Sequence, residues 1–255
     1  MTTPSARRMV RALWRAGSDF LYPPSCPHCD TPLERADDAG GGDRLCETCL
    51  DELRPDARDS CACCGAPVGP YLNWSPGCHY CRNDRFAFDS VVRYGVYDGA
   101  LRNACLRIKH RCGIRLTFCL ADLLWDSANR EMLATNAAAV AAVPRHWSQA
   151  LSRDHYAAET LAAALARRMD VPFRGDVLRK LRRTARQSSL LPNERRTNLR
   201  GAFAAELSED LRGATLLLVD DVLTTGSTAH QSARALRNAG AGRVVVAVIA
   251  RGLGR

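Results

Sequence analysis

The 255-residue sequence contains no run of 18 apolar residues, and this absence excludes a membrane-spanning helix. Its first twenty residues are interrupted by arginines and lack the apolar centre of a secretory signal peptide. We therefore expect a cytoplasmic protein without membrane insertion and without a disulfide framework. Two common nucleotide-binding signatures are also missing: there is no G-x-x-x-x-G-K-[ST] loop and no G-x-G-x-x-G motif.

Composition and charge are those of an ordinary globular chain. Hydrophobic residues make up 46% and charged residues 25%, and the length allows one large domain or one core with a small appendage. The net charge is +9, and the only lysines among the 36 basic residues are Lys109 and Lys180. We attribute that bias to codon composition. A basic excess of this size permits binding of phosphates or nucleic acid but is not evidence of either.

The twelve cysteines are concentrated in one part of the chain, since nine of them lie between Cys26 and Cys81. Four C-x-x-C units can be read there. Each unit directs two thiolates at one point, so two units complete the tetrahedral shell of a zinc ion. The sequence therefore predicts two closed, structural zinc sites. The predicted ligands are Cys26, Cys29, Cys46, Cys49, Cys61, Cys64, Cys78 and Cys81.

The pairing of these units stays open at this point. Sequential pairing puts the first two units on one ion and the last two on the other, whereas a cross-braced pairing has the same spacings. Cys63 can replace a ligand of the third unit. Cys105, Cys112 and Cys119 recur at seven residues, a spacing that keeps one helical face. We interpret these three as buried small side chains rather than a third site.

Beyond residue 85, apolar strand patterns alternate with helical patterns. Such alternation predicts an α/β fold with a mainly parallel sheet covered by helices on both faces. The expected strands span 88–97, 137–144, 216–219 and 243–249. The expected helices span 100–110, 116–133, 148–169 and 227–239. We divide the chain into an N-terminal helix (1–25), a double zinc-ribbon region (26–85) and an α/β domain (86–255).

The segment Thr215–Thr228, TLLLVDDVLTTGST, carries the strongest functional signal. An apolar strand runs into Asp220 and Asp221, and a hydroxyl-rich turn with one glycine then opens a helix. Ligands of parallel sheets bind where the strands end, and the N–H groups of such a turn bind an anion. Two adjacent carboxylates suit the hydroxyls of a ribose, with Mg²⁺ nearby. A 5-phosphorylated sugar satisfies both halves, whereas helix capping alone explains only the threonines.

The sequence VDDVLTTGST closely resembles the phosphoribosyl-pyrophosphate loop of type I phosphoribosyltransferases. The whole chain resembles the ComF (GntX-like) branch of that superfamily, whose members carry a cysteine zinc-ribbon region ahead of the transferase domain. Two further segments resemble that branch, YDGALRNACLRIKHRCG (97–113) and LRRTARQSSLLPNERRTNLRGAF (181–203). The resemblance implies a type I phosphoribosyltransferase-like sheet flanked by helices.

The resemblance also implies roles for particular residues. Lys109, Asp220 and Asp221 are the implied catalytic residues, assisted by Mg²⁺, and segment 182–198 is the implied flap over the site. The implied ligands of phosphoribosyl pyrophosphate are Asp220, Asp221, Val222, Leu223, Thr224, Thr225, Gly226, Ser227 and Thr228 and, on the pyrophosphate side, Pro144 and Arg145. Residues 153–158 (RDHYAA) depart from the branch's R-G-F/Y-N-Q-A pattern, because the glycine, asparagine and glutamine are missing.

The function expected from these features is that of a Mg²⁺-dependent phosphoribosyltransferase that binds phosphoribosyl pyrophosphate and whose acceptor the sequence does not identify. The alternative is a non-catalytic competence factor for DNA uptake, which would bind single-stranded DNA or a helicase partner through its zinc ribbons and basic surface. The two functions require different ligands. The first requires a pentose phosphate at the aspartate pair, and the second requires salt-sensitive binding of DNA.

Overall fold

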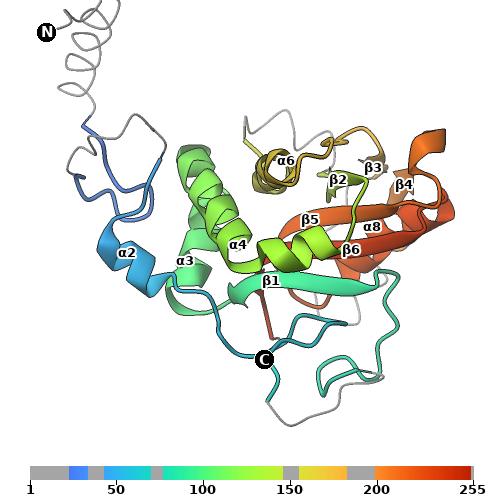
Figure 1. Cartoon of the computed structure of the whole chain (residues 1–255), viewed down its shortest axis with the longest axis horizontal. Helices are drawn as coiled ribbons and strands as arrows, with labels where there is room; N and C mark the ends of the chain where they lie inside the picture. Colours follow the sequence, from blue (N-terminus) through green and yellow to red (C-terminus); the bar gives the residue numbers. More distant parts are fainter. Residues whose placement is uncertain (1–22, 34–42, 70–76, 146–154, 183–198, 254–255) are drawn as a thin grey trace, which may run out of the picture.

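The computed structural model describes residues 23–33, 43–69, 77–145, 155–182 and 199–253. A four-stranded parallel sheet forms its centre (Figure 1), with the strand order β1-β6-β5-β2. The strands are β1 (Ser90–Val96), β2 (Ala139–Ala142), β5 (Thr215–Leu223) and β6 (Arg243–Arg251). The predicted parallel sheet is therefore confirmed.

Residues 216–219 of β5 and 244–250 of β6 are entirely apolar because both faces of the sheet are covered there. Leu217 and its partner Val245 face one hydrophobic core, whereas Leu216 and its partner Val244 face the other. All four side chains are inaccessible to solvent. The sheet is thus a rigid platform whose carboxyl edge carries the segments singled out above.

Helices and a small second sheet cover the two faces. The first face packs against α3 (Gly99–Arg107), α4 (Ile114–Ala134) and α6 (Ala157–Met169). The opposite face packs against α8 (Ser227–Asn238) and an antiparallel pair, β3 (Leu178–Lys180) and β4 (Phe203–Ala205). Short 3-10 turns occupy η1 (Arg111–Gly113) and η3 (Glu209–Leu211).

The strands differ from the predicted ones in two respects. The strand expected at 216–219 continues to Leu223, so Asp220 and Asp221 lie within it rather than after it. Strand β6 causes the extension, because it runs alongside and keeps the backbone paired as far as Leu223 with Arg251. The antiparallel pair β3–β4 was not predicted, since three residues per strand are too few to show a two-residue period.

The interpretation of Cys105, Cys112 and Cys119 as one buried helical face is wrong in part. Cys105 in α3 and Cys119 in α4 are buried, but Cys112 is exposed. The chain turns at η1, which separates α3 from α4, so the seven-residue spacing does not continue on a single helix. No third cysteine cluster is found in the described ranges.

The first ribbon, whose described residues are 26–33 and 43–49, lies against α3 and α4 (Figure 1). It leads into a short helix, α2 (Glu47–Glu52). The guanidinium of Arg107 in α3 donates to the carbonyl of Pro27 at 3.0 Å and pairs with the Asp30 carboxylate at 2.5 Å. The predicted N-terminal helix, by contrast, falls almost entirely outside the described residues.

The second ribbon, whose described residues are 61–69 and 77–81, lies by the C-terminal residues (Figure 1). The N–H of Val91 in β1 donates to the carbonyl of Ala62 at 2.8 Å. Between the ribbons, Asp56 pairs with the buried Arg93 of β1 at 2.8 Å. Burial raises the pKa of Asp56, but hydrogen bonds from the neighbouring arginines outweigh it and bring the pKa to about 2. Each ribbon is therefore anchored to the sheet domain at a different place.

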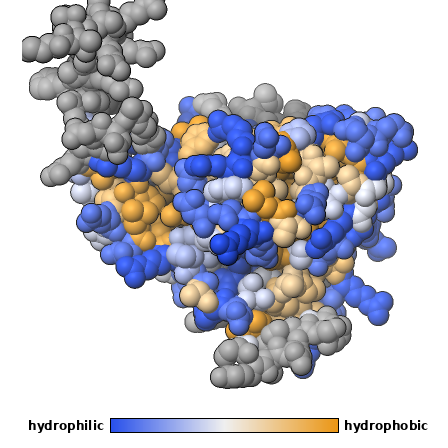
Figure 2. Space-filling view, viewed as in Figure 1, coloured by the Kyte–Doolittle hydropathy of each residue, from blue (hydrophilic) through white to orange (hydrophobic). Residues whose placement is uncertain are grey.

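The surface in Figure 2 is mainly hydrophilic, with apolar side chains in scattered groups. Exposed large apolar residues in the described ranges include Leu50, Tyr80, Leu133 and Leu181, which come from different elements. Single exposed apolar residues are normal on globular proteins. Among the helices of the described ranges, none has the length and apolar character needed to cross a membrane.

Candidate functional site

The turn between β5 and α8 encloses a small hollow at the carboxyl edge of the sheet. Its volume is about 20 Å³, enough for a water-sized group. The hollow lies at the first turn of α8, where the positive end of the helix dipole favours an anion. The hydroxyls of Thr225 and Ser227 lie 2.9 Å apart beside it. The lining residues are Asp220, Val222, Leu223, Thr224, Thr225, Gly226, Ser227, Thr228 and Ala229.

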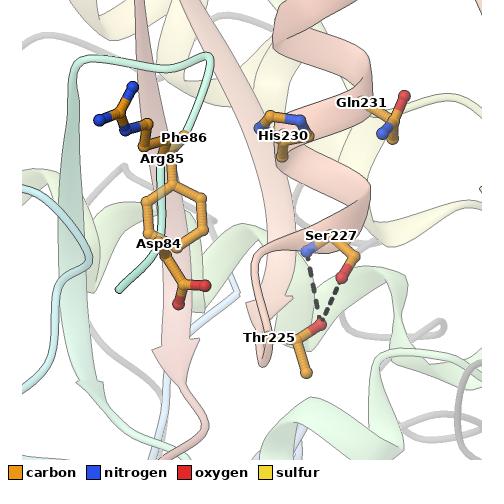
Figure 3. Close-up of a pocket in the computed structure, with 7 residues that line it drawn as sticks. All are labelled: Asp84, Arg85, Phe86, Thr225, Ser227, His230 and Gln231. Carbon is orange, nitrogen blue, oxygen red and sulfur yellow. Dashed lines mark hydrogen bonds between the residues drawn. The ribbon is translucent and has the colours of Figure 1, made fainter. Parts of the chain in front are cut away.

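Gly226 gives the turn its shape. It caps α8 with a φ of +74°, a left-handed conformation that favours glycine. A Cβ at this position would lie 2.9 Å from the ring of Phe86. Figure 3 shows Phe86 facing the turn, with Thr225 and Ser227 joined by hydrogen bonds. The conformation of the turn therefore depends on a glycine and on a residue that follows the second ribbon.

Asp220 lines the hollow, Asp221 follows it in β5, and both aspartates are half-buried. The Asp221 carboxylate pairs with the Lys109 ammonium at 3.0 Å. Burial raises the pKa of Asp220 well above its usual range, and the neighbouring Asp221 charge adds to the effect. Burial lowers the pKa of Lys109, but the two aspartates outweigh it, so the net pKa is raised and the ammonium form is favoured.

The turn after α3 positions Lys109. Helix α3 ends at Arg107, and the N–H of Lys109 still donates to the carbonyl of Leu106 at 3.3 Å. Gly113 in η1 lies so close that a Cβ there would be 2.5 Å from the Cα of Ile108. The glycine of the 97–113 segment thus lets the chain fold back against the residue before Lys109.

The pyrophosphate-side residues follow β2 directly. The guanidinium of Arg145 lies 5.2 Å from the ring centre of Tyr156, at the start of α6, in a cation–π contact. The Tyr156 hydroxyl donates to the carbonyl of Val143 at 2.9 Å. Burial raises the pKa of Tyr156 well above its usual range, and Asp220 and Asp221 raise it further. Pro144 lies between Val143 and Arg145 in the sequence, so Tyr156 holds the turn after β2 against the start of α6.

Lys180, the second lysine of the chain, is the last residue of β3. Its ammonium lies 5.7 Å from the ring centre of Phe203, across the β3–β4 pair. Burial lowers its pKa, as does the charge of Arg182, while the Asp220 carboxylate acts in the opposite direction. The Asp220 charge acts to raise the pKa of both lysines, and the ion pair with the aspartate pair is made by Lys109.

The structure thus brings Asp220 and residues 222–228 to one hollow, and it pairs Lys109 with Asp221, the remaining loop residue. Pro144 and Arg145 are not among the residues that line the hollow. Of the predicted flap 182–198, only Arg182 lies within the described residues, and Arg153 of the departing segment lies outside them. Tyr156, which contacts Arg145 and Val143, was not predicted from the sequence.

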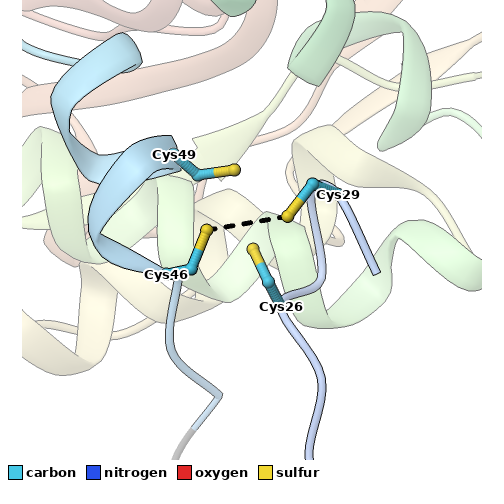
Figure 4. A group of neighbouring side chains, drawn as sticks. All are labelled: Cys26, Cys29, Cys46 and Cys49. Atoms are coloured by element: carbon cyan, nitrogen blue, oxygen red, sulfur yellow. Dashed lines mark hydrogen bonds between the residues drawn. The ribbon is translucent and has the colours of Figure 1, made fainter. Parts of the chain in front are cut away.

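The first four-cysteine set has the geometry of a zinc site. Cys26, Cys29, Cys46 and Cys49 point at a common centre (Figure 4), and all four Sγ atoms lie within 4.8 Å of one another. The Sγ atoms of Cys29 and Cys46 are 3.6 Å apart. A tetrahedral shell with Zn–S bonds of about 2.3 Å has Sγ–Sγ edges of about 3.8 Å. Four thiolates at this spacing fit zinc.

The second set consists of Cys61, Cys64, Cys78 and Cys81, all of them buried. The Sγ distance from Cys61 to Cys81 is 3.8 Å, and that from Cys64 to Cys78 is 3.5 Å. Burial raises the pKa of the Cys64 thiol to about 12, so a cation is needed to hold it as a thiolate. Each set takes its four sulfur atoms from two consecutive C-x-x-C units, so the pairing of the units is sequential rather than cross-braced. Cys63 lies outside the second set.

Comparison with family models places two domains on this chain. Residues 17–84 match the double zinc ribbon domain, and residues 155–255 match the phosphoribosyl transferase domain. The chain therefore carries a phosphoribosyl transferase domain behind a double zinc ribbon domain, as the resemblance to the ComF branch predicts. The predicted fold class is confirmed as well. The first match contains both four-cysteine sets, and the second contains the loop with its aspartate pair.

Two curated relatives match over most of the chain. "Competence protein F" of Haemophilus influenzae is 27% identical over 89% of this chain and 96% of its own length. "DNA utilization protein YhgH" of Salmonella typhi is 27% identical over 82% of this chain and 91% of its own. Among solved structures, a glutamine phosphoribosylpyrophosphate amidotransferase from B. subtilis matches 53% of this chain and 27% of its own, at 23% identity and a TM-score of 0.33. A score that low supports no argument.

Proposed function

We propose that this chain binds phosphoribosyl pyrophosphate at the loop between β5 and α8 and acts as a phosphoribosyltransferase. The observation that carries the proposal is that Asp220 lines the hollow at the first turn of α8, while the adjacent Asp221 pairs with Lys109. A helix N-terminus binds phosphate, and two carboxylates next to it suit the hydroxyls of a pentose. The match of residues 155–255 to the phosphoribosyl transferase domain supports the same class of ligand.

In the proposed reaction the bond between C1 of the ribose and the pyrophosphate oxygen breaks, and the electron pair leaves with the pyrophosphate. The ribose passes through an oxocarbenium-like state and then bonds to an acceptor nucleophile. Residues 224–228 hold the 5-phosphate through backbone N–H groups and hydroxyls. Asp220 and Asp221 accept hydrogen bonds from the ribose hydroxyls, and Lys109 and Arg145 neutralise the departing pyrophosphate. Charge held in place for the transition state is usually the largest catalytic contribution.

The aspartate pair also has the donor set for a magnesium ion. Mg²⁺ is commonly bound by one or two carboxylates together with substrate phosphates. The pKa of Asp220 is raised by burial and by the Asp221 charge, so a cation bound next to Asp220 favours its ionised form. When bound, Mg²⁺ would supply charge neutralisation for the pyrophosphate. Lys109 already contributes one positive charge on the Asp221 side.

Isothermal titration with phosphoribosyl pyrophosphate and Mg²⁺ tests the proposal. We expect saturable heat with the full chain and none with Asp220→Asn/Asp221→Asn. Asp210→Asn is the matched control, because Asp210 is an exposed aspartate of η3, away from the loop. An unchanged titration in the double variant, or no heat with the unaltered chain, would remove the transferase proposal.

A second candidate function is DNA handling, and the names of the relatives favour it. Two of them are called "Competence protein F" and "DNA utilization protein YhgH". Under this alternative the zinc ribbons and arginine-rich surface bind single-stranded DNA or a helicase of the uptake machinery. Binding measured at several salt concentrations tests it, because phosphate contacts make affinity fall steeply with salt. A binding signal that is absent or insensitive to salt counts against DNA binding. If chelation of zinc abolishes capture of a partner protein but leaves DNA binding intact, the result favours a helicase partner.

A further inference from the structure

The second ribbon is joined to the proposed phosphate loop by one buried arginine. Arg251, at the end of β6, is 6% exposed. Its Nε donates to the carbonyl of Cys64 at 2.7 Å. Its Nη1 donates to the carbonyl of Leu223 at 3.1 Å and also to that of Thr224. A single guanidinium thus connects a residue of the second four-cysteine set with the last residue of β5 and the first residue of the loop.

The loop is supported from the same side by the chain that leaves the second ribbon. The ring of Phe86 occupies the space in which a Cβ on Gly226 would lie. The N–H of Ala87 donates to Nδ1 of His230 in α8 at 3.0 Å. Figure 3 shows Asp84–Phe86 on one side of a cavity of about 120 Å³ and the first residues of α8 on the other. The turn is therefore held between its own sheet and the ribbon.

The C-terminal residues complete this support. The N–H of Gly252 donates to the carbonyl of Leu223 at 2.8 Å, and a Cβ on Gly252 would lie 3.2 Å from Cγ2 of Thr224. Leu253 packs against the buried cysteines of the second ribbon. The chain after β6 therefore contacts the loop with one residue and the ribbon with the next.

We propose that zinc in the second ribbon and a phosphorylated pentose in the loop bind cooperatively, with Arg251 as the positioning residue that transmits the effect. This proposal rests on the proposed function of the loop. Zinc fixes the Cys64 backbone, because a closed four-thiolate shell orders the turn that carries it. The fixed carbonyl holds Arg251, and Arg251 holds the carbonyls of Leu223 and Thr224. A loop already ordered in this way loses less conformational freedom when it binds a ligand.

Titration with ribose 5-phosphate tests the coupling. This probe carries the sugar and the phosphate of the proposed ligand and lacks its pyrophosphate. We compare the full chain, Cys78→Ser/Cys81→Ser, Arg251→Met and the triple variant, with zinc counted by native mass spectrometry. We expect about tenfold weaker binding in each of the first two variants, within the usual range for coupled sites. In the triple variant we expect no further loss, because both changes break the same connection.

A reciprocal measurement keeps the test valid if the cysteine variant does not fold. Saturating ribose 5-phosphate should raise the zinc affinity of the unaltered chain's second set by the same factor, as measured by competition with a chromophoric chelator. The effect should be lost in Arg251→Met and kept in Arg107→Met, which removes an arginine that contacts the first ribbon. Equal ribose 5-phosphate affinity with and without the second zinc overturns the coupling alone. Absence of ribose 5-phosphate binding to the unaltered chain overturns the proposed function as well.

Discussion

The two four-cysteine ribbons have the same ligand set and similar Sγ spacing, yet they contact different parts of the sheet domain. The first lies against α3 and α4, where Cys26 and Cys49 join the larger hydrophobic core. The second reaches β1, the end of β6 and the loop before α8. The ligand set of a structural zinc site therefore does not indicate which part of the protein the ribbon supports. The residues that pack against the ribbon decide whether it supports only the fold or also a binding loop.

Replacing zinc ligands in one ribbon at a time should have the largest effect on zinc content and stability. We expect Cys26→Ser/Cys29→Ser and Cys61→Ser/Cys64→Ser each to retain one zinc, because the sulfur atoms form two separate sets. Structural zinc contributes directly to the folding free energy, so both variants should also unfold at lower temperature. Native mass spectrometry counts the ions. Loss of both ions from either variant would mean that the sets are not independent.

Replacing Lys109 should affect ligand binding and leave both ribbons intact. Lys109→Met removes the ammonium that pairs with Asp221, and hydrogen bonds to charged groups contribute about 1.5–3 kcal/mol. We therefore expect about ten- to hundredfold weaker binding of phosphoribosyl pyrophosphate by titration calorimetry. Arg102→Met, an exposed change in α3, is the control. Equal affinities in the two variants would contradict the assignment of Lys109.

The contact between Gly226 and Phe86 can be isolated with a second glycine. Gly226 and Gly213 both have a φ of +74°, but a Cβ on Gly213 would meet nothing within 4 Å. We expect Gly213→Ala to show backbone strain alone, about 1 kcal/mol. Gly226→Ala should cost about 1–2 kcal/mol more, because it also displaces Phe86. Chemical denaturation measures both, and equal losses would show that Phe86 does not constrain the loop.

Replacing Arg107, which contacts the first ribbon, should have the smallest effect on the free energy of unfolding. Its ion pair with Asp30 is largely exposed on the Asp30 side, where the side chain is 69% accessible. Exposed pairs contribute about 0–1 kcal/mol. Arg107→Met should therefore change the free energy of unfolding by less than about 1.5 kcal/mol, including the bond to Pro27, as measured by denaturant titration. A larger loss would mean that the first ribbon depends on this arginine as strongly as we propose for the loop and Arg251.

The features that the sequence predicted are those encoded within short segments. The C-x-x-C units and VDDVLTTGST are contiguous, so residue type and spacing alone indicate their chemistry. The extent of β5 was not predictable in this way, because Asp220 and Asp221 have low strand propensity and pair only because β6 runs beside them. The same reason applies to three other residues, Tyr156, Lys180 and Arg251. Each makes its contacts with residues far away in the sequence, and such contacts cannot be predicted from a short segment.

The most direct test of the central claim is a crystal structure of the full chain with ribose 5-phosphate. We predict that the phosphate lies at the first turn of α8, within hydrogen-bonding distance of the N–H groups of residues 225–228. The ribose hydroxyls should face Asp220 and Asp221. A phosphate bound only on the arginine-rich surface, with the aspartate pair still closed against Lys109, would contradict the account.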